Sequence, residues 1–237
     1  MATNEHDELQ ALKAWWNENW LFITVGLFIS VGSVVGYRMW EARQLELTEQ
    51  ASNVFEAASE AALDGDLETL AARTGTLESD YAGTPYAAQA ALLHAAKLVE
   101  NGELQAAAGK LRWAMNNSDD PELALLARLR LARVMLMTDQ AADATSLLTA
   151  VEAGAYDALY QETLGDAALL QGDREQARAH YSEALALLDG DAVGDRQMVE
   201  MKLQNVEMPM SALDTASAAD EPADATAESG DDSQAGE

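Results

Sequence analysis

The sequence contains no cysteine, which excludes disulfide scaffolds, cysteine-ligated zinc sites, iron–sulfur clusters and thiolate nucleophiles. The three histidines, His6, His94 and His180, are too far apart in the sequence to share a local metal-binding motif. We interpret His94 and His180 as packed or surface side chains of helices. No phosphate-binding glycine loop, GxSxG or HExxH motif occurs. We therefore expect no enzyme, and neither a metal nor a cofactor.

Basic residues are also scarce. There are 14 Lys and Arg against 41 Asp and Glu, which gives a formal net charge of -27 and a pI near 4.1. Such a charge repels phosphate backbones and argues against nucleic-acid binding. Aromatic residues make up only 6% of the chain, whereas apolar residues reach 49%. Because Ala and Leu are prominent among them, the composition favours a helical fold.

Charge is absent altogether between Glu18 and Arg38. At about 1.5 Å per residue, 20 helical residues reach about 30 Å, the thickness of the hydrocarbon core of a bilayer. Aromatic residues flank this run at both ends, as membrane interfaces favour: Trp15, Trp16 and Trp20, then Tyr37 and Trp40. A buried soluble helix and a cleaved signal peptide are the alternatives. The latter fits poorly, because the preceding segment is acidic and the run is long. We predict an uncleaved transmembrane anchor at 20–40.

Small residues recur along one side of this anchor. They are Gly26, Ser30, Ser33 and Gly36, and Gly32 forms a GxxxG pair with Gly36. Small residues let a second transmembrane helix approach closely, so this stripe is a candidate surface for packing against a partner helix. The alternative is that these glycines reflect only the ordinary composition of membrane helices.

Residues 1–19 form a separate N-terminal segment. Leu9, Leu12 and Trp16 recur at helical spacing, which is typical of a helix lying on the membrane surface or of a helical extension of the anchor. The flanking bases are Lys13 before the anchor and Arg38 and Arg43 after it. By the positive-inside rule, this small difference favours the C-terminal part on the cytoplasmic side.

From about residue 43 to 206, apolar residues recur three and four positions apart, which predicts helices throughout. Breaks are predicted where Gly and Pro gather: around Gly65, Gly83–Pro85, Gly102, Pro121, Gly154 and Gly172. The fold class is therefore all-α, with one N-terminal transmembrane helix followed by a helical domain at 41–208.

The helices repeat. Residues 158–189 place Leu164-Gly165 in a first helix and Ala177, Tyr181 and Ala184 in a second helix. This pattern resembles the tetratricopeptide repeat, an α-solenoid of helix pairs in which a small residue lets the second helix approach and an aromatic side chain fills the adjacent gap. Two earlier copies precede this one, the first 33 residues before it and the second a further 37 residues before that. A degenerate helix pair surrounds Gly65. Residues 195–206 then form a C-terminal capping helix. The alternative is a generic Ala-rich bundle.

The first helices of such repeats line a concave face. Taking its positions from the repeat register gives a mostly apolar candidate protein-binding face: Leu92, Val99, Leu126, Leu129, Arg133, Leu136, Leu159 and Leu169. Such a face accepts a partner's hydrophobic segment if it is open. Alternatively, Leu126, Leu129 and Leu136 are buried internally. The only basic cluster, around Arg128, either meets acidic groups of a partner or neutralises neighbouring acids.

The final segment, 209–237, is acidic and lacks aromatic residues. It cannot bury enough apolar surface to offset chain entropy, so the sequence predicts a disordered tail.

The order of these features resembles the YfgM family, the ancillary subunits of the SecYEG translocon of Gram-negative bacteria. The likeness covers residues 5–208, including Tyr37-Arg38-Met39-Trp40 and the segment 197–203, but not the tail. It implies an inner-membrane protein with a cytoplasmic N-terminus and a periplasmic repeat domain, opposite to the charge bias around the anchor. It also implies SecYEG and a PpiD-like periplasmic chaperone as partners.

By this resemblance, the protein is an adaptor at the translocon that helps to pass newly secreted, unfolded polypeptides to folding factors. The alternative is a structural assembly subunit that binds one dedicated membrane partner and makes no contact with clients.

Overall fold

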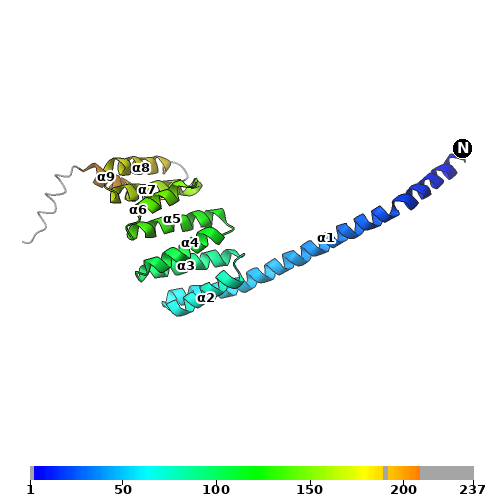
Figure 1. Cartoon of the computed structure of the whole chain (residues 1–237), viewed down its shortest axis with the longest axis horizontal. Coiled ribbons are helices and arrows are strands. Elements are labelled where there is room, and N and C mark those ends of the chain that lie inside the picture. The colour runs from blue at the N-terminus through cyan, green and yellow to red at the C-terminus, as the bar shows by residue number, and fades with distance from the viewer. Residues whose placement is uncertain (1–2, 189–191, 209–237) are drawn as a thin grey trace, which may run out of the picture. The chain divides into compact units, whose positions relative to one another are not determined.

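The structure is a computed structural model that describes residues 3–188 and 192–208. Its described part is helical and contains no β-strand. The helices are α1 (Thr3–Asp64), α2 (Leu67–Asp80), α3 (Pro85–Glu100), α4 (Leu104–Asn117), α5 (Pro121–Met137), α6 (Ala141–Thr149), α7 (Asp157–Leu170), α8 (Arg174–Leu187) and α9 (Arg196–Glu207), with a 3-10 turn η1 (Gly154–Tyr156) before α7. The all-α class and the repeat organisation are confirmed (Figure 1). The predicted tail, 209–237, lies outside the described residues.

The chain divides into two compact units, and the boundary between them along the chain lies between Val134 and Met135. In the first unit, the C-terminal part of α1 packs against α2 and α3, and α3 packs against α4. In the second unit, α7 packs against α6 and α8, and α8 packs against α9. Neighbours in sequence are therefore neighbours in space within each unit, as in a repeat array.

Helix α1 is longer than the predicted anchor. It runs without interruption for 62 residues, so residues 3–19 continue the helix of the anchor and form no separate element (Figure 1). Its first buried side chain among the described residues is Ala51, and the last turns, from there to Asp64, form the first helix of the first hairpin. One helix therefore serves both the apolar segment and the repeat domain.

The turns between paired helices share one geometry. Each contains a residue with positive φ: Gly65 (74°), Gly102 (77°), Asp139 (59°) and Gly172 (80°). The amide that follows this residue donates to a carbonyl near the end of the first helix, over 2.8–2.9 Å, in all four turns. This is a Schellman-type helix end, in which one residue takes the left-handed αL conformation and the next amide donates to a carbonyl of the last helical turn. The turn at Asp139 was not among the predicted Gly and Pro breaks.

The repeat positions named from sequence form the core. Ala177, Tyr181 and Ala184 are at most 1% exposed, as are their counterparts Ala107 and Ala114 in α4. A side chain at Gly165 would lie 2.4 Å from Cε1 of Tyr181, so the glycine gives the aromatic ring its space. One counterpart departs from the pattern, because α6 ends at Thr149 and Val151 is 38% exposed.

Candidate protein-binding surfaces

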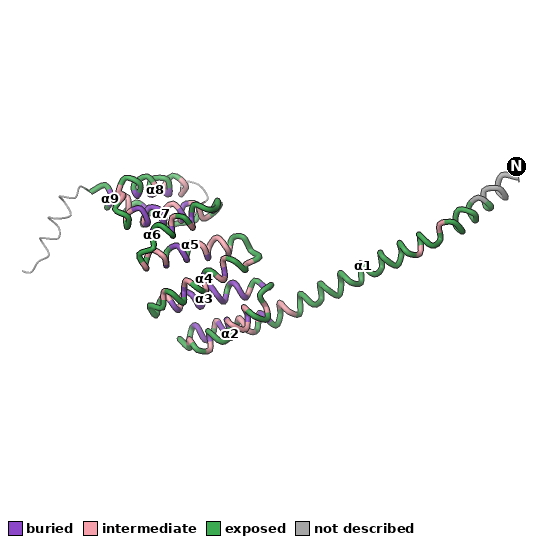
Figure 2. Tube along the Cα trace, in the orientation of Figure 1, coloured by how far each residue is buried: buried purple, intermediate pink, exposed green. Residues whose placement is uncertain are grey.

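The N-terminal part of α1 carries the largest apolar surface. Within the described residues, α1 is the one helix long and apolar enough to cross a membrane, and its most apolar stretch has no buried residue (Figure 2). Phe22, Phe28 and Ile29 are 75%, 74% and 64% exposed. In water such exposure would be strongly unfavourable, so this part of the helix suits a lipid environment.

The small-residue stripe lies within this surface. Ser30 and Ser33 donate their hydroxyl hydrogen bonds to the carbonyls of Gly26 and Ile29, each over 2.8 Å. Nothing in the described chain lies within 4 Å of a Cβ placed on Gly26, Gly32 or Gly36. The stripe therefore offers close approach of backbones, while its hydroxyls are already satisfied within the helix.

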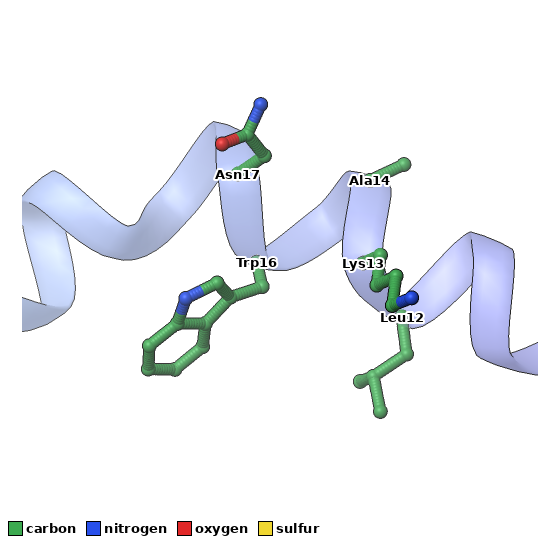
Figure 3. Close-up of a pocket in the computed structure, with 5 residues that line it drawn as sticks. All are labelled: Leu12, Lys13, Ala14, Trp16 and Asn17. Carbon is green, nitrogen blue, oxygen red and sulfur yellow. The ribbon is translucent and has the colours of Figure 1, made fainter.

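The segment of α1 before the anchor combines apolar and polar side chains. Leu12, Lys13, Ala14, Trp16 and Asn17 follow one another on this helix. Leu12 and Trp16 point to one side of α1, whereas Ala14 and Asn17 point away from it (Figure 3). This segment is therefore amphipathic, and its apolar side suits the membrane interface.

The predicted concave face is only partly exposed. Leu92 and Leu129 are 5% and 1% exposed, so these two side chains belong to the core. This corrects the assignment of Leu92 to an exposed binding face, and for Leu129 it agrees with the alternative of internal burial. Leu126 of α5 and Leu136 at its end are half-buried. The remaining members are half-buried except for exposed Arg133: Val99, Leu159 and Leu169.

A charged cluster closes the second unit. Lys202 of α9 lies 2.6 Å from Oε1 of Glu162 and 2.7 Å and 2.8 Å from the two carboxylate oxygens of Asp166, both on α7. The Tyr181 hydroxyl donates to Asp166 over 2.8 Å. Burial, with this hydrogen bond, raises the pKa of Tyr181 well above its ordinary value, so the phenol stays protonated as a donor.

The end of α9 is held by a second basic residue. Nη2 of Arg174, at the start of α8, donates to the carbonyls of Asn205, Val206 and Met208, over 3.2, 2.6 and 2.9 Å. These carbonyls belong to the last turn of α9 and to the residue after it, which the helix itself leaves without donors. Val199 and Val206 of α9 are buried in the core of the second unit, and half-buried Leu203 packs against the same core. The polar contacts of Lys202 and Arg174 add to this apolar attachment.

Sequence reasoning missed this cluster. The spacing of four residues between Glu162 and Asp166 puts both carboxylates on one side of α7. Nothing in the sequence pairs them with Lys202, because this contact depends on the packing of α9 over α7 and α8.

His94 and His180 both lie within helices of the repeats. His94 of α3 is 6% exposed, and its Nδ1 atom has no hydrogen-bond partner. His180 is half-buried, with its Nδ1 atom 2.7 Å from Oε1 of Gln161. Burial lowers the pKa of both imidazoles. Over the described ranges, no three His, Asp or Glu side chains are arranged to hold a metal ion.

The chain is similar in sequence to known translocon subunits. Residues 13–208 match the family described as a tetratricopeptide repeat-like domain. The chain is 32% identical to the ancillary SecYEG translocon subunit of Aggregatibacter actinomycetemcomitans, over 85% of this chain and 97% of that protein. It is 29% identical to the protein of the same name from Escherichia coli, over 86% and 98% of the two chains. The chain therefore belongs to the tetratricopeptide repeat-like family of ancillary SecYEG translocon subunits.

Proposed function

We propose that this protein is an adaptor at the Sec translocon. Its α1 helix anchors it in the inner membrane beside SecYEG, and its repeats offer contacts to a PpiD-like chaperone and to newly secreted polypeptides. The observation that carries the proposal is the match to ancillary translocon subunits over nearly their whole length, from the exposed apolar helix to α9. The anchor supplies proximity, which raises the local concentration of the repeats near the channel.

The proposed topology places the N-terminus in the cytoplasm and the repeats in the periplasm. This topology can be tested by labelling introduced cysteines, because the chain has no native thiol. An impermeant maleimide should label Asn116→Cys, an exposed position at the end of α4, in intact spheroplasts. The matched variant Ala14→Cys, on the other side of the anchor, should react only after lysis. The reverse pattern would place the repeats in the cytoplasm and contradict the proposal.

Association with the translocon is tested through the stripe. Gly32→Leu together with Gly36→Leu should reduce the SecYEG that co-purifies from membranes, because leucines hold a partner helix away from the backbone. Leu27→Ala provides the matched control, as it changes the same anchor outside the stripe. Equal recovery from all variants would reject the stripe as the contact.

A second candidate function is assembly alone, in which the repeats bind one dedicated membrane partner. The burial of Leu92 and Leu129 favours it, because it leaves less apolar surface for clients. Photo-crosslinkers at half-buried Leu126 and Leu136 separate the two functions. Adducts with many secreted polypeptides support the adaptor, whereas one discrete adduct supports assembly.

A further inference from the structure

The junction between the anchor and the repeats has the composition of a helix. No Gly or Pro occurs between Gly36 and Gly65, so the residues that make linkers flexible are missing. The segment 41–50 reads EARQLELTEQ, in which only Thr48 is a weak helix former. The flanking helical turns already supply the nucleus, so a short exposed segment between them continues the helix at little cost.

The structure shows this segment as a bare helical stalk. Residues 41–50 lie within α1, and none of them is buried, which Figure 2 shows as an almost continuously green stretch. At about 1.5 Å per residue, the stalk spans about 15 Å between Trp40 and Ala51. It is therefore a spacer that is ordered by its own backbone hydrogen bonds.

The stalk also relates two faces of α1. Gly26, Ser30, Ser33 and Gly36 lie 25 residues, about seven turns, before Ala51, Phe55, Ala58 and Ala61. Ala51, Ala58 and Ala61 are at most 6% exposed, and Phe55 is half-buried against the repeats. Residues a whole number of turns apart share one side of a helix. The stripe and the face that α2 and α3 cover are therefore on the same side of α1.

We propose that α1 is a rigid stalk that fixes both the height and the rotational position of the first repeat hairpins above the membrane. The proposal rests on the proposed function for the identity of the membrane partner. A partner helix seated on the stripe then lies beneath α2 and α3, so the hairpins face the channel and do not sweep freely around it. The stalk thus sets orientation as well as proximity.

Spin labels in the full chain in lipid vesicles test the rigidity without any partner. Leu27, Leu45 and Leu63 are 62%, 68% and 88% exposed and follow one another at 18 residues, about five turns and 27 Å. Both cysteine pairs, Leu27→Cys with Leu45→Cys and Leu45→Cys with Leu63→Cys, should give narrow distance distributions near this value. Adding Ala42→Gly and Arg43→Pro should broaden the first distribution and leave the second unchanged. If the pair at positions 27 and 45 gives an equally broad distance distribution without these two substitutions, the stalk is not rigid and the proposal is wrong.

Insertions test the rotational position. Helix-forming inserts of seven and nine residues after Arg43 differ by about 3 Å in length, but only seven residues make about two whole turns. With a photo-crosslinker at exposed Ala72 of α2, the seven-residue insert should retain at least half of the SecYEG adduct that the chain without an insert forms. The nine-residue insert should reduce the yield of this adduct about fivefold. Equal adducts from both would overturn a fixed rotation. If the unmodified chain forms no SecYEG adduct, the proposed function fails, while the spin-label distances still decide whether the stalk is rigid.

Discussion

Asp166 holds Lys202 through both of its carboxylate oxygens, which lie 2.7 Å and 2.8 Å from the ammonium nitrogen. This bidentate contact joins α7 to α9, and Glu162 adds a third oxygen at 2.6 Å. These charges add to the apolar attachment of α9, which buries Val199 and Val206 and packs Leu203 against the same core.

Replacing Lys202 by Met should therefore loosen α9. The substitution leaves Glu162 and Asp166 close together without their shared cation, which we expect to cost about 1–2 kcal/mol of unfolding free energy. Thermal denaturation of the full chain in detergent, followed by circular dichroism, should show the midpoint fall by several degrees. Lys97→Met, which removes the exposed pair with Glu100, is the control and should change little. Equal effects would show that the cluster adds no stability.

The contact between Gly165 and Tyr181 gives a second prediction. A Cβ at Gly165 would lie 2.4 Å from the ring, so Gly165→Ala should force Tyr181 to move and cost about 1–3 kcal/mol. The counterpart pairs in other repeats are Ala132 with Leu148 and Ala95 with Leu111. Adding Tyr181→Leu should therefore recover part of the loss in a denaturation measurement.

Gly109→Ala is the matched control for this pair. Gly109 is exposed within α4, and nothing lies within 4 Å of an added Cβ. The substitution should stabilise the protein by about 0.5–1 kcal/mol, because alanine favours the helix. A loss at Gly109 as large as at Gly165 would contradict the role given to Tyr181.

Asp139 occupies the turn position that glycine takes in the other three hairpins. With φ at 59°, its side chain makes the left-handed conformation less favourable than it is for glycine. Asp139→Gly should stabilise the fold by about 0.5 kcal/mol, and Gly172→Ala should destabilise it by about 1 kcal/mol. Opposite shifts of the two denaturation midpoints are the expected result, and shifts of the same sign would contradict it.

His94 predicts a dependence of stability on pH. Burial lowers the pKa of its imidazole, and Lys110 lowers it further, whereas Glu78 and Glu103 act in the opposite direction. The unfolded chain then binds the proton more readily than the folded chain. Stability should therefore be full above about pH 6.5, the ordinary pKa, and should decrease as the pH falls from there towards the lowered pKa.

His94→Leu should weaken this dependence and raise stability at neutral pH. Leu131 and Leu164 hold the same position in later repeats, and leucine removes a buried nitrogen that has no partner. Denaturation midpoints between about pH 7.5 and 5 measure both effects. His180→Gln is the control, and it should retain the part of the pH dependence of stability that His94 causes. A pH dependence that is unchanged in His94→Leu would contradict the prediction.

The helix pairs could be predicted because Gly and Pro mark most of their ends and because Gly165, Tyr181 and their counterparts keep a fixed spacing. The turn at Asp139 carries no such mark. Only the repeat register points to it, since it lies 33 residues before Gly172 and 37 after Gly102. Local composition thus found the glycine turns and missed the one in which aspartate takes the same conformation.

The charged cluster could not be predicted from the sequence. Lys202 meets Asp166 only after three helices pack together, which no local spacing encodes. The continuity of α1 has a local cause in the sequence, because no Gly or Pro occurs between Gly36 and Gly65, whereas the charge-free run marks only the membrane anchor at 20–40. The concave face was wrong at Leu92, and at Leu129 the alternative of internal burial holds, because register gives a position within a repeat but not the depth of its burial.

The hydrogen bond that Arg174 donates to the carbonyl of Met208 has a practical consequence. The described part of the domain ends at Met208, whose carbonyl accepts this bond on the surface of the repeats. Every interhelical contact described above lies before this residue, so we expect a fluorescent or affinity module fused to the C-terminus to retain them.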